Sequence, residues 1–120
     1  MELTFVRVKG SYMAGFSKSR LSHIGILLID PDRELSLIIK KVLKTLGFNT
    51  IHIARDGQSA LNLMKKDVID LVITDWDMTP MSGIEFIKNV RRSEDSPNPF
   101  VPIILLTGHA KRSHVETARD

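Results

Sequence analysis

Two carboxylates lie in the stretch between Asp70 and Gly83, and they are the side chains of this sequence best suited to chemistry. Asp75 directly follows an apolar, β-branched run that is too short for a free-standing helix and is typical of a buried strand. Asp77 comes two residues later, and turn residues then lead into a helical pattern. Because ligands of open α/β sheets bind at the carboxyl ends of strands, Asp75 is a candidate nucleophile or metal ligand. A solvated turn residue or a helix cap is the alternative interpretation.

Two further predicted strands end on a polar residue. Asp30 follows the apolar run 26–29, and Thr107 ends a later apolar run that Gly108 interrupts. Neighbouring parallel strands end at one edge of a sheet, so we expect Asp30, Asp75 and Thr107 to converge there. Carboxylates gathered at one edge repel one another, so something cationic is expected among them. Hard oxygen ligands suit Mg²⁺, which typically uses one or two carboxylates and a phosphoryl oxygen.

This predicted cluster suits phosphoryl transfer. A carboxylate can attack a phosphoryl group and form an aspartyl phosphate, and the metal then neutralises charge while the protein positions the groups. The Thr107 hydroxyl could donate a hydrogen bond to a phosphoryl oxygen on Asp75, and Gly108 leaves room for it. These residue types therefore favour an aspartyl-phosphate site.

The scaffold for this site is predicted from residue 24 onward. Apolar strands alternate with helical patterns in the order βαβαβαβα, and the crossovers have the length that parallel strands require. Such connections are right-handed and place helices on both faces of a doubly wound parallel sheet in the α/β class, with four βα units. Strands are predicted near 24–29, 50–54, 68–74 and 101–107, and helices follow at about 31–46, 57–66, 83–92 and 111–119.

The first of these helices carries the clearest local signals. Pro31 suits the first helical position, Asp30 could serve as N-cap, and Gly47 is expected to end the helix. Its apolar residues recur at helical spacing and are expected to form one stripe, with lysines opposite. They are Leu35, Ile38, Ile39, Val42, Leu43 and Leu46.

Charge and composition exclude several classes of function. Residues 1–23 carry four basic groups and one acidic group, whereas residues 24–120 carry 13 of each, so the net charge of +3 belongs to the N-terminal segment. We therefore expect no direct nucleic-acid binding. The absence of cysteine excludes disulfides and thiolate sites. No apolar run approaches the roughly 20 residues of a membrane span, and no signal peptide is visible, which predicts a cytoplasmic protein without a membrane partner.

Residues 24–119 resemble the response-regulator receiver domains of two-component systems. The resemblance rests on Ile26–Asp30, on Asp75-Trp-Asp-Met-Thr-Pro-Met-Ser-Gly83, which is close to the family's D-x-x-M-P-x-M-x-G, and on Val101–Gly108. It implies a flavodoxin-like topology and a domain that accepts a phosphoryl group from a histidine kinase or phosphotransfer protein. Phosphorylation would change contacts with a downstream output protein or domain, so no turnover enzyme is expected.

The resemblance also implies roles for individual residues. Asp75 would be the phosphoacceptor, Thr107 the switch hydroxyl, and Asp30, Asp75 and the main-chain carbonyl of Asp77 would hold Mg²⁺. Trp76, beside the acceptor, should report metal binding through its fluorescence. Trp76, Asp77, Gly108 and His109 would flank the phosphoryl group.

Departures from the family's pattern affect the metal site. The family usually has paired acids after its first strand, but the second position here is Pro31, and Asp32 comes one residue too late. A small shift could bring Asp32 closer, and weaker or rearranged Mg²⁺ binding is expected. Thr79 is also inserted before Pro80, which lengthens the loop beside the site by one residue.

The family's fifth strand and helix, with a lysine that pairs with the phosphoryl group, should follow Arg119, which predicts a C-terminally truncated receiver over 24–120. The predicted fourth strand would then be an exposed edge and a possible homodimer contact. Residues 1–23 are interpreted as an extension or linker with a possible strand at 3–8. Alternatively, Phe5–Gly10 replaces the missing strand, with Lys9 as the lysine, in a permuted or strand-exchanged arrangement.

Two other functions remain open at this point. Asp75-x-Asp77-x-Thr79 also matches the nucleophile motif of haloacid-dehalogenase-like phosphatases, although the chain leaves no room for their later motifs. A receiver-like module that binds proteins without phosphorylation is the other, because Pro31 and the absent lysine weaken the phosphorylation site. Turnover of p-nitrophenyl phosphate with Mg²⁺ would support the phosphatase, whereas failure of Asp75 to accept phosphate from a small donor would support the binding module.

Overall fold

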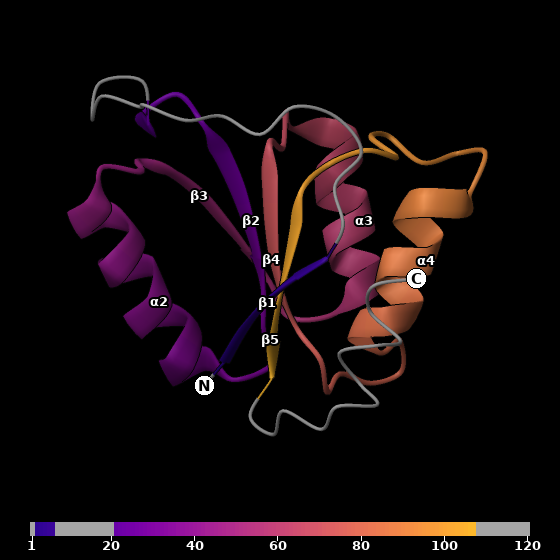
Figure 1. Cartoon of the computed structure of the whole chain (residues 1–120), viewed down its shortest axis with the longest axis horizontal. Coiled ribbons are helices and arrows are strands. Elements are labelled where there is room, and N and C mark those ends of the chain that lie inside the picture. Colours follow the sequence, from indigo (N-terminus) through magenta and orange to yellow (C-terminus); the bar gives the residue numbers. More distant parts are fainter. Residues whose placement is uncertain (1, 7–20, 108–120) are drawn as a thin grey trace.

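The computed structural model describes residues 2–6 and 21–107, which form a five-stranded sheet with helices on both faces (Figure 1). The strand order is β1-β5-β4-β2-β3, and β2 to β5 are mutually parallel, so the predicted doubly wound parallel sheet is confirmed. The helix expected at 111–119 lies outside the described residues. The strands are β1 Glu2–Val6, β2 Gly25–Ile29, β3 Thr50–Ala54, β4 Leu71–Asp75 and β5 Ile103–Thr107, and the helices are α2 Arg33–Leu46, α3 Gly57–Lys66 and α4 Gly83–Arg92.

The hydrophobic core has two parts, one on each face of the sheet. Helices α3 and α4 cover one face, and α2 covers the other (Figure 1). The central strand β2 is covered from both sides, and each residue of Ile26–Ile29 is completely buried, which explains its uninterrupted apolar sequence. None of the helices in the described part of the chain is long and apolar enough to cross a membrane.

The start of α2 differs from the sequence prediction. Its N-cap is Asp32, whose side chain accepts a hydrogen bond from Leu35 N at 3.1 Å, so the expected cap at Asp30 with Pro31 inside the helix is wrong. The reason is that Asp30 stays bound to the neighbouring strand, where its N–H donates to the Ala54 carbonyl at 3.0 Å. The predicted end is confirmed, because Gly47 adopts φ 113°, a left-handed conformation that glycine accepts without strain.

The apolar stripe of α2 is only partly buried. Leu43 is buried and Leu35 and Ile39 are half-buried, but Ile38, Val42 and Leu46 are 58%, 53% and 54% exposed. Only part of the predicted stripe therefore packs against the core in the described part of the chain. Among the described helices α2 alone lies on this face, so the outer side of its stripe has no neighbouring helix to cover it (Figure 1).

Strand β1 covers the edge of β5. The pair is antiparallel, with Glu2 opposite Thr107 and Val6 opposite Ile103. The edge on which the homodimer expectation rested is thus paired within the chain. The N-terminal segment thus covers this edge, as the alternative expected, but β1 is antiparallel and runs away from the carboxyl end of β5, so it is not a parallel replacement strand; Lys9 lies outside the described residues.

Glycine at the start of α4 allows this helix to pack directly on the end of β4. A Cβ at Gly83 would overlap the Asp75 carbonyl oxygen and lie 3.1 Å from Trp76 Cα. Gly83 N also donates to the Trp76 carbonyl at 2.9 Å, which closes the loop between the strand and the helix. The loop that carries Asp77 is therefore fixed at both ends by main-chain contacts.

We predict that Gly83→Ala lowers the free energy of unfolding by about 1–3 kcal/mol, because a side chain there must displace backbone atoms. Gly57→Ala is the matched control at the first residue of α3. Its Cβ would meet the flexible end of Met81, with Sδ at 2.6 Å, so a smaller loss is expected. Urea denaturation measures both, and equal losses would contradict the backbone explanation.

Candidate functional site

The sheet brings the predicted carboxylates to one edge. Ile29 pairs with Thr74 in the parallel β2–β4 ladder, so the next residues, Asp30 and Asp75, stand side by side where the strands end. Asp75 in turn pairs with Leu106 of β5, which places the backbone of Thr107 at the same edge. Gly108 and His109 lie outside the described residues.

Asp30 is buried, with 1% of its surface exposed, and three of its four polar atoms have hydrogen-bond partners. Its N–H donates to the Ala54 carbonyl, its own carbonyl accepts from Arg55 Nη1 at 3.3 Å, and Oδ1 accepts from Asp32 N at 2.8 Å. Oδ2 is buried and has no hydrogen-bond partner among the described residues. An unpaired buried carboxylate oxygen is costly and indicates that another group completes the site.

Asp75 is half-buried at the end of β4, and its Oδ1 accepts from Trp76 N at 2.8 Å. Burial raises the pKa of Asp75, and the negative charge of Asp30 raises it further. The negative charge of Asp77 also raises this pKa, by less. The main-chain groups of Trp76 and Asp77 oppose the rise. Burial also raises the pKa of Asp30. The carboxylates of Asp30 and Asp75 thus repel each other where burial limits screening by water.

The loop after Asp75 separates exposed from buried side chains. Asp77 is exposed, Trp76 is half-buried and packs against the core, and Met78 is buried. The Thr74 hydroxyl, fully buried below the site, donates to the Asp75 carbonyl at 3.1 Å. The inserted Thr79 is exposed, so the extra residue is accommodated on the outside of the loop.

Arg55 is a neighbour of the site that the sequence analysis did not identify. It directly follows β3, and its positive charge lowers the pKa of Asp30, against the larger effect of burial. Its Nη1 also donates to Ser36 Oγ at 2.8 Å. The sequence predicted that a cation accompanies the carboxylates. It did not identify Arg55 as that neighbour, because no local pattern links Arg55 to Asp30 and only the pairing of β3 with β2 brings them together.

The carboxylate pair fits a magnesium ion in part. The described residues contain no group of three or more acidic, histidine or cysteine side chains that could hold a metal ion, so an all-protein cage is not formed. Mg²⁺ needs only one or two carboxylates, with water and a phosphoryl oxygen for the rest. Asp30 and Asp75 supply two carboxylates, and the unpartnered Asp30 Oδ2 is an oxygen that a cation would complete. Asp32 uses its Oδ1 as a helix cap.

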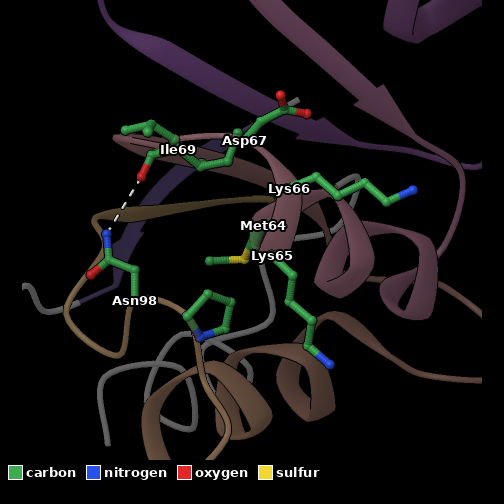
Figure 2. A pocket seen from close by; sticks show the side chains of 8 residues that line it. Met64, Lys65, Lys66, Asp67, Ile69 and Asn98 are labelled. Atoms are coloured by element: carbon green, nitrogen blue, oxygen red, sulfur yellow. Dashed lines mark hydrogen bonds between the residues drawn. The ribbon is translucent and has the colours of Figure 1, made fainter.

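A pocket of about 350 Å³ lies at the opposite edge of the sheet, where α3 ends and β4 begins (Figure 2). Asn98 Nδ2 donates to the Ile69 carbonyl at 3.4 Å across it. Figure 2 shows Lys65 and Lys66 extending away from Asn98 with their ammonium groups apart, so they do not form one anion site. The pocket is therefore separate from the carboxylates.

Comparison with known proteins identifies the family. Residues 26–120 match the family model described as response regulator receiver domain. Chemotaxis protein CheY-3 of Vibrio cholerae serotype O1 is 39% identical over 93 residues, which are 78% of this chain and 70% of that protein. Chemotaxis protein CheY of Pseudomonas aeruginosa is 34% identical over 90 residues, covering 75% of this chain and 71% of the relative.

Solved structures agree with the sequence relatives. Chemotaxis protein CheY4 of Vibrio cholerae superposes with a TM-score of 0.70 at 29% identity, covering 78% of this chain and 76% of that chain. The MaeR response regulator bound to beryllium trifluoride superposes with a TM-score of 0.66 at 27% identity, covering 79% and 75%. The flavodoxin-like receiver fold expected from the sequence is confirmed.

The raised pKa values predict an unusual pH dependence. A carboxyl group whose pKa rises on folding stabilises the folded state below its ordinary value of 3.8, and this contribution is lost as pH rises through the raised pKa. At neutral pH without Mg²⁺, Asp30→Asn and Asp75→Asn should therefore each raise the melting temperature. The gain should shrink as pH falls toward 3.8.

Thermal melting at several pH values measures this effect. Asp95→Asn, an exposed residue in the loop after α4, is the control and should change the melting temperature little at any pH. A fall in melting temperature for both site variants at neutral pH would show that the carboxylates do not strain the fold.

Proposed function

Because this chain belongs to the response regulator receiver family, we propose that its Asp75 carboxylate accepts a phosphoryl group from a histidine kinase or phosphotransfer protein. A carboxylate oxygen of Asp75 attacks the phosphorus, a P–O bond forms, and the P–N bond to the donor imidazole breaks. The electron pair of the broken bond remains on the imidazole nitrogen.

The observation that carries this proposal is the position of Asp75 beside Asp30, whose buried Oδ2 has no hydrogen-bond partner among the described residues. The raised pKa of Asp75 beside Asp30 means that a cation bound there would stabilise the two ionised carboxylates. Phosphoryl transfer needs positive charge at the same place. Structural carboxylates are usually satisfied by hydrogen bonds, whereas this oxygen is left open.

Mg²⁺ is the cation proposed for the site, held by Asp30, Asp75 and the main-chain carbonyl of Asp77. When bound, it would neutralise charge on the transferring phosphoryl group. The protein's own part is positioning: Trp76 N–H holds Asp75 Oδ1, and Asp32 N–H holds Asp30 Oδ1. Asp32 is left out of the ligand set, because its side chain caps α2.

Phosphorylation would add close to two negative charges at the carboxyl ends of the strands. We propose that the Thr107 hydroxyl hydrogen-bonds a phosphoryl oxygen, and that Gly108, His109 and Trp76 flank the group. The altered edge would change which output protein or domain binds. The domain then acts as a switch in a signalling pathway and not as a turnover enzyme.

Intact-mass spectrometry after incubation with acetyl phosphate and Mg²⁺ tests the acceptor. The parent protein should gain the mass of one phosphoryl group, and Asp75→Asn should gain none. Asp77→Asn is the control, because it changes an exposed acid two residues away and keeps the main-chain carbonyl. Absence of an adduct from folded parent protein would favour the module that binds partners without phosphorylation.

Trp76 offers a direct measure of metal binding. Mg²⁺ should change the Trp76 fluorescence saturably, because the indole is half-buried next to Asp75. Asp30→Asn should lower the Mg²⁺ affinity measured in this way by at least about tenfold. Beryllium trifluoride, bound by the MaeR relative, should change the signal again only when Mg²⁺ and Asp75 are both present. A response to Mg²⁺ that survives Asp30→Asn unchanged would exclude Asp30 as a ligand.

A further inference from the structure

We infer that Arg55 is a positioning residue that fixes the end of β2, and with it the Asp30 carboxylate, for the proposed magnesium and phosphoryl site. This inference rests on the proposed function for its purpose and on the described contacts for its geometry. Arg55 lies in the connection between β3 and α3, outside every motif that the family resemblance draws on.

The arginine joins three elements through one nitrogen. Its Nη1 donates to the Asp30 carbonyl at 3.3 Å and to Ser36 Oγ at 2.8 Å. Ser36 is completely buried in the first turns of α2, and its hydroxyl donates in turn to the Arg33 carbonyl at 2.9 Å. The β3–α3 connection, the end of β2 and the start of α2 are thereby linked at one place.

This link completes the fixation of Asp30. The residue before the arginine, Ala54, accepts from Asp30 N at 3.0 Å, so consecutive residues 54 and 55 hold both main-chain groups of Asp30. Asp32 N holds one carboxylate oxygen at 2.8 Å. What remains is Oδ2, the open oxygen, whose direction is set by the other three contacts. A family member with a second acid at position 31 would have another way to hold a metal, but here Pro31 offers no side-chain ligand.

Position and charge predict opposite effects of removing Arg55. A cation beside a metal site repels Mg²⁺, so loss of the guanidinium charge alone would tighten Mg²⁺ binding. Loss of the link frees Asp30 and weakens binding, as removal of groups that orient metal ligands usually does, by about 10–100-fold. The arginine is largely exposed, so its charge is screened by solvent, and the positional effect should be the larger one.

The test compares Mg²⁺ affinity, read from Trp76 fluorescence, in the parent protein, Arg55→Ala and Ser36→Ala. Both substitutions should weaken binding about tenfold, the second without any change of charge. Arg55→Lys keeps a charged donor and should recover part of the loss. Arg92→Ala, an exposed arginine at the end of α4, controls for net charge, and Asn98→Ala, at the opposite edge, controls for lost stability. Neither control should change Mg²⁺ affinity.

A measurement without metal separates this inference from the proposed function. Amide hydrogen exchange at Asp30 and Asp32 should become faster in Arg55→Ala than in Arg92→Ala. The Asp30 amide donates to the Ala54 carbonyl and the Asp32 amide donates to the Asp30 carboxylate, so both bonds open more often when Asp30 is less well fixed. Unchanged exchange, or tighter Mg²⁺ binding by Arg55→Ala, would overturn the positioning role even if Asp75 accepts phosphate. Faster exchange in Arg55→Ala, together with no Mg²⁺ binding by the parent protein, would support the positioning role and reject the proposed magnesium site.

Discussion

Repulsion between Asp30 and Asp75 is the constraint on which the rest of the structure depends. Parallel pairing of β2 with β4 places the two carboxylates next to each other, and burial denies them the water that would screen them. Main-chain N–H groups and Arg55 compensate part of the repulsion, and one oxygen of Asp30 is left without a partner. A fold selected for stability alone would replace such a pair by neutral residues, so the retained strain points to function.

The surrounding elements keep this strained edge in place. Buried strand β2 cannot shift, because Ile26–Ile29 are covered on both faces, and α4 begins so close to β4 that only a glycine fits at position 83. The hydroxyl of Thr74 supports the Asp75 carbonyl from below. Rigid packing below the edge and an exposed loop above it give a site that is positioned by the core and open to a partner.

Local patterns in the sequence predicted most of the scaffold. The helix over Gly83–Arg92 and the strand over Thr50–Ala54 have the expected bounds, because periodicity, caps and turn residues lie within each segment. Three features required non-local information. The N-cap is Asp32 and not Asp30, because Ala54 holds Asp30 in the sheet. Arg55 lies at the site only because β3 packs beside β2 in the fold. Strand propensity at the N-terminus does not indicate whether the strand pairs parallel or antiparallel.

The antiparallel pairing of β1 with β5 has a consequence for how the chain folds. Glu2 meets Thr107, so this contact joins residues from nearly opposite ends of the described chain, whereas β2, α2 and β3 assemble from neighbouring segments. Closing so large a loop is slow relative to local assembly, which places the docking of β1 late in folding. Until then the apolar β5 is an open edge, and a nascent or concentrated chain is most prone to aggregate during that interval.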